Sequence, residues 1–258
     1  MLNPEHICLI GTGKLSRHLA KKLRLYKGKP IYIWGRNCDK AAQIAREFEL
    51  IHLEDLMQIP MNCVAIFCVS DHAIETLANK LKGIADYMVH LSGTQTIHVL
   101  TKYTLNAAVM WPVQSFSFQS HMEWKRIPLV LEVSNTDAKE WLMELVNALG
   151  GMPVFLDEES RKKLHLAAVV SNNFLNHLMV LTETWCIENK LDFQLLLPLI
   201  SQSIANLNDQ SPTELQTGPA SRNDQTIVQA HLDMLQAHAQ LKEVYSLMSS
   251  QISENYRI

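Results

Sequence analysis

The sequence predicts an α/β protein: a mostly parallel sheet with crossover helices, followed by an all-helical C-terminal part. Up to about residue 156, short apolar runs alternate with helical patterns, as they do in successive βα units. The run over residues 63–69 is apolar throughout, which is typical of a strand buried on both faces of a parallel sheet. From Glu158 onward strand patterns are absent and helical periodicity dominates. We therefore predict two domains, residues 1–157 and residues 158–258.

The elements of the first domain follow one another in short steps. Strands are predicted over residues 7–10, 30–35, 50–53, 63–69, 87–91, 107–111, 128–133 and 154–156. Helices are predicted after Gly13, over 41–48, from Asp71 to Leu81, and over 137–149, where Gly150-Gly151 is a stop signal. The second domain is predicted to hold helices over roughly 160–189, 192–207, 224–236 and 238–254.

Composition and charge exclude several classes of partner. The chain has 258 residues, 47% of them hydrophobic, and a net charge of -3, which gives no reason to expect nucleic acid or an anionic membrane as a partner. No run approaches the roughly 18 consecutive apolar residues of a membrane-spanning helix, and the first strand begins too early for a signal peptide. The five cysteines are scattered without metal-site spacing. We expect a cytoplasmic, reduced protein without a metal.

A glycine pair directly follows the first predicted strand. The apolar run 7–10 stops at Gly11, and leucines spaced by four then mark the buried stripe of a helix. Gly11 can adopt the backbone angles of a sharp turn, and Gly13 would let a pyrophosphate approach the unpaired amides at the helix N-terminus. This pattern is typical of a dinucleotide-binding βαβ unit in a Rossmann-type fold, although Ser16 replaces the third glycine of the fingerprint. A tight turn that binds nothing is the alternative interpretation.

The residues after the second strand bear on which dinucleotide binds. NAD-specific folds place an acid there for the ribose 2′-hydroxyl, whereas an Arg accommodates a 2′-phosphate. Here Arg36 and Asn37 follow the strand, and no acid occurs before Asp39. An Arg in this position is commonly only solvated, but beside the glycine pair it favours NADP(H) over NAD(H).

The strand over residues 63–69 ends at the sheet edge where ligands of this fold bind. We expect the main chain of Val69 and Ser70 to border the cofactor, and we favour a helix N-cap over a ligand contact for the Asp71 side chain. The full set of expected cofactor contacts is Gly11, Thr12, Gly13, Lys14, Leu15, Arg36, Asn37, Val69, Ser70, Ser92 and Gly93.

The long C-terminal helix carries polar groups on one stripe of an otherwise apolar segment. At about 100° per residue, Asn172 lies near His165 in projection and Asn176 lies near both. Such groups need partners, either in a hydrogen-bonded core or in a ligand, and both interpretations stay open. Of the three, only His165 titrates near neutral pH, so it is the candidate general acid.

A second polar cluster lies further along the helical part. Gly218-Pro219 marks a turn, and Asp224 is well placed to cap the helix that follows. Arg222 is free either to bind an anionic ligand or to pair with Asp224.

The chain resembles a family of Rossmann-like oxidoreductases of unassigned reaction, in which a dinucleotide domain precedes a helical domain of unknown function. This family is distantly similar to pyrroline-5-carboxylate reductase and the β-hydroxyacid dehydrogenases. The resemblance covers nearly the whole chain and rests on Gly11-x-Gly13, Arg36, His90-x-Ser92-Gly93, Pro112-x-Gln114-x-Phe116, His165-x-Ala167-Ala168, Asn173-Phe174, Thr217-Gly218-Pro219, Arg222-x-Asp224 and His231.

The resemblance implies NADP(H) binding, a substrate site in an interdomain cleft and a homodimer formed through the helical domain. Two departures stand out: Trp111 replaces a usual His, and His165 lies on the helix where the dehydrogenases use a Lys. The resemblance favours Asn173 where helical geometry favours Asn172. From the residues and the resemblance together, the candidate catalytic residues are His165, Asn173 and Thr217, and the candidate substrate contacts are Gln114, Asn172, Gly218 and Arg222.

Our first hypothesis is an NADPH-dependent reductase that acts on a small polar carbonyl or imine compound. The second is a nucleotide-responsive binding protein without turnover, whose helical domain recruits a partner. A deazaflavin partner in place of a second organic substrate is a third possibility. A dinucleotide fold alone does not define the reaction, so the substrate is not assigned from sequence.

Overall fold

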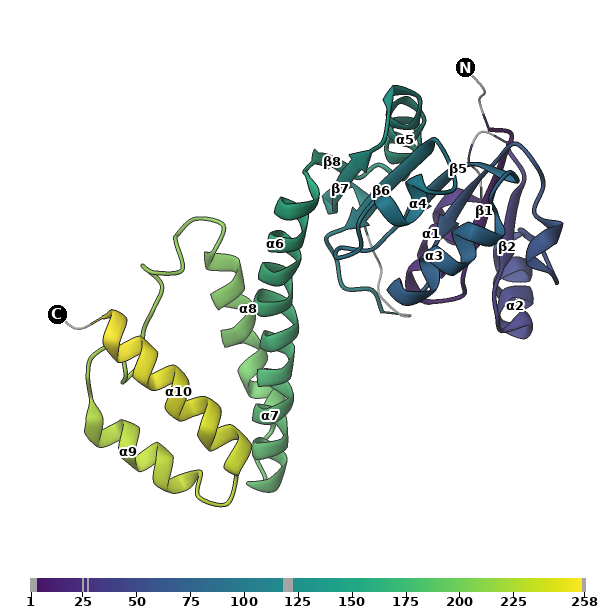
Figure 1. Ribbon diagram of the computed structural model, residues 1–258. Coiled ribbons are helices and arrows are strands. Elements are labelled where there is room, and N and C mark those ends of the chain that lie inside the picture. The colour runs from purple at the N-terminus through teal and green to yellow at the C-terminus, as the bar shows by residue number, and fades with distance from the viewer. Residues whose placement is uncertain (1–3, 25, 27, 118–122, 257–258) are drawn as a thin grey trace. The chain divides into compact units, whose positions relative to one another are not determined.

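The structure is a computed structural model that describes residues 4–24, 26, 28–117 and 123–256. The chain divides into two compact units, Met1–Ala168 and Val169–Ile258, and each is described by itself. The first unit holds an eight-stranded sheet with its helices, and the second consists of helices and their connections (Figure 1). The predicted fold class, a Rossmann-type mostly parallel sheet followed by an all-helical part, is confirmed.

The strands lie in the order β3-β2-β1-β4-β5-β6-β7-β8. Neighbouring strands are parallel except for β6 and β7, which are antiparallel. The chain adds β2 and β3 on one side of β1 and then returns to add β4 on the other side, so the strand order reverses between β1 and β4. Ligands of open α/β sheets bind at such a reversal. The strands are β1 (His6–Ile10), β2 (Ile31–Trp34), β3 (Ile51–His52), β4 (Cys63–Phe67), β5 (Ala85–His90), β6 (Asn106–Pro112), β7 (Pro128–Val133) and β8 (Met152–Phe155).

Alternating side chains divide the core between the two faces of the sheet. In β1, Ile7 and Leu9 join the cluster under α1, α2 and α5, whereas Cys8 and Ile10 join the cluster under α3 and α4. All five residues of β4 are buried, which confirms the prediction of a strand covered on both faces. The helical elements of this part are α1 (Lys14–Leu23), α2 (Cys38–Phe48), η1 (Leu56–Gln58), α3 (Asp71–Lys80), α4 (His98–Thr101), η2 (Trp124–Arg126) and α5 (Thr136–Leu149).

The start of one helix and the N-cap of another differ from their predictions. Helix α2 begins at Cys38, earlier than predicted, because the Asn37 side chain accepts a hydrogen bond from the Lys40 amide at 2.9 Å. The N-cap of α3 is Ser70, and Asp71 is its first helical residue. The predicted cap role of the Asp71 side chain is therefore wrong. The four-residue helix α4 was not predicted, since so short a segment shows no periodicity.

The sheet unit includes helix α6 (Glu158–Ala168). The Asp157 carboxylate accepts a hydrogen bond from the Ser160 amide at 2.7 Å, which stabilises the start of this helix. Arg161 of α6 is fully buried and pairs with Glu132 of β7 at 2.9 Å. These contacts attach the helix to the sheet, so the boundary between the units falls after Ala168, later than the predicted boundary between residues 157 and 158.

The second unit continues the same helix through a π-helical turn. With η3 (Val169–Phe174) and α7 (Leu175–Glu188), α6 forms one helix of 31 residues, Glu158–Glu188. The remaining elements lie close to the predicted ranges and are η4 (Phe193–Leu196), α8 (Leu197–Asn206), α9 (Gln225–Met234) and α10 (Ala239–Asn255).

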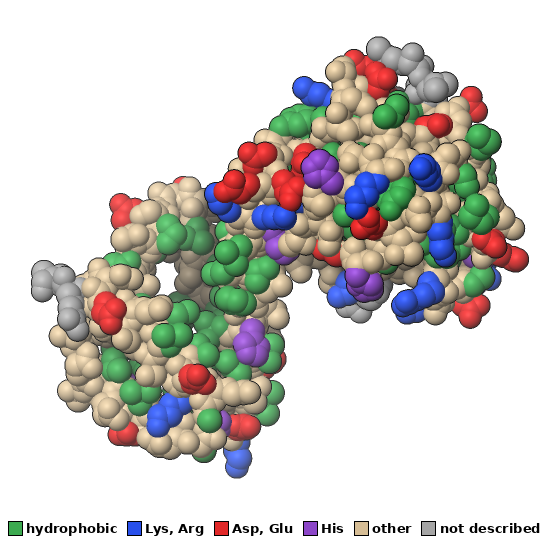
Figure 2. All heavy atoms as spheres, in the orientation of Figure 1, with side chains coloured by type: hydrophobic (Ala, Val, Ile, Leu, Met, Phe, Trp, Pro, Cys, Tyr) green, Lys and Arg blue, Asp and Glu red, His purple; other side chains and the backbone are tan. Residues whose placement is uncertain are grey.

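Most apolar side chains of the second unit are exposed or only partly buried in the single chain. Figure 2 shows hydrophobic side chains spread over the surface of this unit, and the buried ones among its described residues are Cys186, Ala220, Val228 and Leu235. Helix Glu158–Glu188 is long and apolar enough to cross a membrane, and its most apolar stretch is not buried. One such helix is weak evidence for a membrane span.

Candidate functional site

The glycine loop after β1 lies at the reversal of strand order. Gly11 has φ +121°, a backbone conformation that favours glycine. A Cβ atom on Gly11 would lie 2.3 Å from the carbonyl oxygen of Cys68, at the end of β4. Both the backbone angle and the space therefore require glycine here. This close approach brings the loop after β1 beside the segment that leads from β4 into α3.

Gly13 differs from Gly11 because nothing in the protein crowds it. Gly13 is the N-cap of α1, and the nearest atom to a Cβ placed there is the Cys68 carbonyl oxygen at 3.9 Å. The fully buried Ser16 donates its hydroxyl to the Gly11 carbonyl at 2.6 Å. The serine at the third fingerprint position thus holds the turn, and the start of a helix such as α1 is a place where an anion can bind.

The loop after β2 contains Arg36 and Asn37, which the sequence predicts at the adenosine end of a dinucleotide site. A Cβ atom on Gly35 would lie 2.4 Å from Thr12 Cγ2, so the first and second βα loops are in close contact. Arg36 is exposed and has no ion pair among the residues that the structure describes. The Asn37 side chain caps α2, because its Oδ1 accepts a hydrogen bond from the Lys40 amide. An exposed Arg in the position of Arg36 is the type of residue that can pair with a 2′-phosphate.

The loop after β5 is held by hydroxyl and carboxylate groups. Ser92 Oγ donates to Asp71 Oδ2 at 2.8 Å, and Thr94 Oγ1 donates to the same oxygen at 2.6 Å. In turn, the amides of Thr94 and Gln95 donate to Ser92 Oγ. Asp71 therefore fixes the loop that contains the predicted cofactor contacts Ser92 and Gly93. The side chain of Asp71 therefore has this tertiary role in place of the helix N-cap role predicted from sequence.

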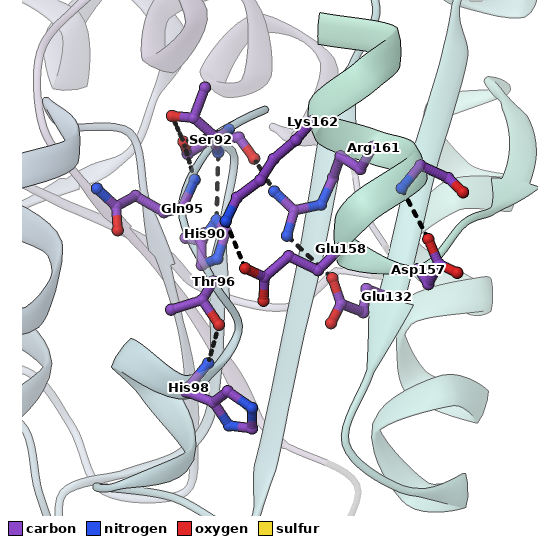
Figure 3. Close-up of polar contacts among 12 residues, drawn as sticks. His90, Ser92, Gln95, Thr96, His98, Glu132, Asp157, Glu158, Arg161 and Lys162 are labelled. Carbon is purple, nitrogen blue, oxygen red and sulfur yellow. Dashed lines mark hydrogen bonds and ion pairs between the residues drawn. The ribbon is translucent and has the colours of Figure 1, made fainter.

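Arg161 holds this loop from the opposite side. Its Nη1 donates to the Ser92 carbonyl oxygen at 3.2 Å, and its Nη2 donates to Glu132 Oε2 at 2.9 Å (Figure 3). Sequence reasoning missed both Arg161 and Glu132. A usable signal was present, because Arg161 lies one helical turn before His165 and so on the same face of α6.

His165 lies against the loop after β5 and the end of β6. A Cβ atom on Gly93 would lie 2.7 Å from His165 Nδ1 and 2.9 Å from Trp111 Cε2. The His165 and Trp111 rings meet edge to face, with centroids 5.4 Å apart. His165 Nδ1 is buried and has no hydrogen-bond partner among the described residues. Three residues therefore form one cluster. They are the candidate acid His165, the candidate nicotinamide contact Gly93, and Trp111, which departs from the family pattern.

His90, at the end of β5, is fully buried beneath this cluster. Its Nδ1 accepts a hydrogen bond from the Ser92 amide at 3.3 Å. Burial, with the nearby Arg161 charge, lowers the pKa of His90 to about 4. His90 is therefore neutral near pH 7 and acts as a hydrogen-bond acceptor for the loop.

The other predicted residues of the sheet unit have local roles or none that is visible. Lys14 and Leu15 begin α1, and Leu15 packs against the core. Val69 contributes to the core on the α3 side. Gln114 is exposed, and its Oε1 accepts a hydrogen bond from the Ser115 amide at 2.8 Å.

The π-helical turn alters the stripe predicted on the long helix. Hydrogen bonds of a π turn run from i to i+5, so each residue rotates the helix by less than 100°. The projection that placed Asn172 near His165 therefore does not apply between Val169 and Phe174. Asn172 and Asn173 are both exposed, and Asn172 Nδ2 donates to Asn173 Oδ1 at 3.2 Å. Single π turns within α-helices are frequent at functional sites.

The cluster before α9 has one structural and one unassigned member. Asp224 Oδ1 accepts from the Ile227 amide at 3.2 Å, which confirms its predicted role as N-cap. Arg222 is exposed and forms no ion pair with Asp224. Gly218 has φ +109°, in agreement with the predicted turn, and Thr217 beside it is exposed. Within the described residues no group of three or more metal-ligating side chains occurs.

The fold and the glycine loop define a two-part protein of the dinucleotide-binding class. The model for shikimate / quinate 5-dehydrogenase matches residues 1–86, and the model for a domain of unknown function (DUF2520) matches residues 127–252. No curated protein matches the chain. Among solved structures, "putative NADP oxidoreductase BF3122" from Bacteroides fragilis is 32% identical with a TM-score of 0.88, and the match covers 98% of this chain and 100% of that one. The chain belongs to the family of this Bacteroides protein, and the resemblance inferred from sequence is confirmed.

More distant structures share the fold. A 1-pyrroline-5-carboxylate reductase from Streptococcus pyogenes has 14% identity and a TM-score of 0.60, with 96% of this chain and 98% of that chain covered. A reductive aminase from Aspergillus terreus, in complex with NADPH and ethyl levulinate, has 14% identity and a TM-score of 0.67, with 98% and 94% covered.

The two glycines give a pair of variants that separates folding from cofactor binding. Gly11→Ala should lower the free energy of unfolding by about 3 kcal/mol, because it adds backbone strain and a clash with the Cys68 carbonyl. Gly13→Ala should change it by less than about 1 kcal/mol, yet weaken NADPH binding at least about tenfold by blocking the pyrophosphate. Urea unfolding and calorimetry measure the two effects. A Gly13→Ala protein that binds NADPH normally would contradict the assigned loop.

The lowered pKa of His90 makes stability depend on pH. Between pH 6.5 and about 4 the unfolded chain takes up a proton at His90 that the folded chain does not, so stability falls as the pH drops. From pH 7.5 to pH 5 this residue should account for about 2 kcal/mol of lost stability. His90→Asn, which keeps an acceptor for the Ser92 amide, should show that much less pH dependence in urea unfolding. Equal losses in the two proteins would mean that His90 does not resist protonation.

Proposed function

We propose that the protein is an NADPH-dependent oxidoreductase that reduces a small polar carbonyl or imine compound. The observation that carries this proposal is the glycine loop at the strand-order reversal, on the same sheet edge as the Ser92–Gly93 loop and His165. Support also comes from the similar proteins, which include an NADP oxidoreductase, a pyrroline-5-carboxylate reductase and a reductive aminase in complex with NADPH. The names of the last two, a reductase of a pyrroline compound and a reductive aminase, motivate the proposed substrate class.

The residues of the sheet unit fit a bound dinucleotide. The amides at the start of α1 would hold the diphosphate, with Gly13 leaving room for it. Arg36 would pair with the 2′-phosphate, and Gly93 would border the nicotinamide. When bound, the cofactor supplies a hydride to the carbonyl or imine carbon.

His165 would supply the proton that balances this transfer. Its Nδ1 is buried against Gly93, so Nε2 is the nitrogen that can donate to the oxygen or nitrogen of the substrate. For orienting the substrate we propose Asn173, Thr217 and, for a carboxylate, Arg222, as the family resemblance implies. Gln114, Asn172 and Gly218 complete the proposed substrate contacts.

Calorimetry with NADPH and NADH, followed by NADPH oxidation assays on a panel of keto acids and cyclic imines, tests the proposal. Binding of NADPH together with oxidation by a member of the panel is expected. Tight NADPH binding without any hydride acceptor would favour a nucleotide-responsive binding protein. Absence of binding by either nucleotide would overturn the proposed function.

Arg36 should set the preference for the phosphorylated cofactor. Arg36→Ala removes a charge-assisted contact and should weaken NADPH binding about tenfold or more while leaving NADH binding unchanged. Arg46→Ala is the matched control, because it removes the same charge from the exposed other end of α2. A parallel loss of both nucleotides in Arg36→Ala would assign Arg36 to folding rather than to the phosphate.

His165→Ala should lower turnover by about 10²- to 10⁴-fold with NADPH affinity retained, because a general acid contributes in the transition state. His98→Ala, which removes an exposed histidine of α4, is the control and should be fully active. Undiminished turnover by His165→Ala would remove His165 as the proton donor.

We also propose that the protein is a cytoplasmic homodimer formed through the second unit. The exposed apolar side chains of that unit support a second copy of the chain as the occupant, because a soluble monomer seldom leaves so many uncovered. They include Phe174, Val180, Ile187, Leu195, Leu199 and Ile204. Light scattering after gel filtration should give twice the chain mass of 29.3 kDa. A mass of one chain at micromolar concentration would contradict the dimer.

A further inference from the structure

We propose that Arg161 is a positioning residue for the nicotinamide end of the site, because it fixes Gly93 relative to His165. The inference rests on the proposed function, since it assigns the Ser92–Gly93 loop to the nicotinamide. Arg161 belongs neither to the sequence motifs nor to the glycine loop.

Arg161 joins three elements while fully buried. From α6 it reaches Ser92, in the loop after β5, and Glu132, on β7 (Figure 3). Its Nε has no hydrogen-bond partner among the described residues. A buried guanidinium that is only partly satisfied is costly, and apolar packing at such positions is often equally stable or better. A role in positioning the Ser92–Gly93 loop therefore explains the buried Arg161 better than a contribution to stability alone.

Ser92 is restrained at two separate atoms. Its carbonyl oxygen accepts from Arg161, and its hydroxyl donates to Asp71 on α3. The main chain of the next residue, Gly93, thus has little freedom to move. On the other side, Gly93 lies against His165, where an added Cβ would be only 2.7 Å from Nδ1. Arg161 and His165 are one helical turn apart on α6, so a single helix face makes both contacts with the loop.

Helix α6 thus contacts this loop at two successive residues: Arg161 hydrogen-bonds to Ser92, and His165 lies against Gly93. Removing the guanidinium breaks the hydrogen bond from Arg161 to the Ser92 carbonyl, while the hydrogen bond from the Ser92 hydroxyl to Asp71 remains. The Ser92 carbonyl then loses its charged donor, and the spacing between Gly93 and the imidazole is no longer fixed. The residues proposed to contact the diphosphate and the 2′-phosphate, Gly11, Gly13 and Arg36, share none of these bonds.

The test compares NADPH with 2′,5′-ADP, which carries the adenosine end without the nicotinamide. Arg161→Met should weaken NADPH binding about tenfold but change 2′,5′-ADP binding by less than about twofold. The fluorescence of bound NADPH, which reports the nicotinamide environment, should shift toward that of free NADPH. Arg161→Lys should give an intermediate result, because one ammonium group cannot reproduce the planar two-pronged contact.

Lys102→Met is the matched control, because it breaks an exposed ion pair with Glu75 at 2.6 Å on other helices of the same unit. It should leave both affinities and the fluorescence unchanged. If Arg161→Met does not fold, Arg161→Lys and Glu132→Gln carry the comparison, since each keeps a polar side chain in place.

Folded variants with wild-type NADPH affinity and fluorescence would overturn the positioning role. Equal weakening of NADPH and 2′,5′-ADP would also overturn it, because that pattern indicates a general structural effect. Either result leaves the proposed function standing, provided that the wild-type protein binds both ligands. Failure of the wild-type protein to bind either ligand would overturn the proposed function and this role together.

Discussion

The nucleotide half of this protein depends on one close approach between main-chain segments. Where β1 ends, Gly11 passes beneath the carbonyl of Cys68 at the end of β4, with no room for a side chain between them. The approach exists because β1 and β4 are adjacent parallel strands whose exits lie at the same edge of the sheet. It sets where α1 begins, and with it the direction of the amides that an anion would meet. The Ser16 hydroxyl then fixes the turn from within.

The loop after β5 is held in place by side chains, in contrast to the glycine loop after β1. The glycine loop is shaped by missing side chains, whereas the loop after β5 is held by charged and hydroxyl groups on both sides. Asp71 and Arg161 bring opposite charges to Ser92, one to its hydroxyl and one to its carbonyl. Hydrogen bonds to charged groups are stronger than neutral ones, so these two contacts hold the loop firmly at Ser92. The neutral His90 below it adds an acceptor without adding a third charge.

The sequence predicted the order of elements well because hydrophobic periodicity is a local property. The strand over 128–133 agrees with β7 residue for residue, and the helix predicted to end at Leu149, before the Gly150 stop signal, does so. The polar network was less accessible. Glu132 and Arg161 are far apart along the chain, and nothing local indicates that they meet. Asp71 was misassigned because a carboxylate at a helix start has a common local role, which tertiary contacts replaced here.

The same limit explains what could be inferred about His165. Its place on an apolar helix predicted a site residue, but the α-helical projection could not anticipate the π turn that begins at Val169. Nor could it indicate which ring nitrogen stays accessible, because that depends on Gly93, which is far away in sequence. A side chain at Gly93 would occupy the place of Nδ1, so the glycine motif after β5 serves the imidazole as much as any cofactor. The position of the His165 ring therefore depends on Gly93, because a larger residue there would clash with the imidazole.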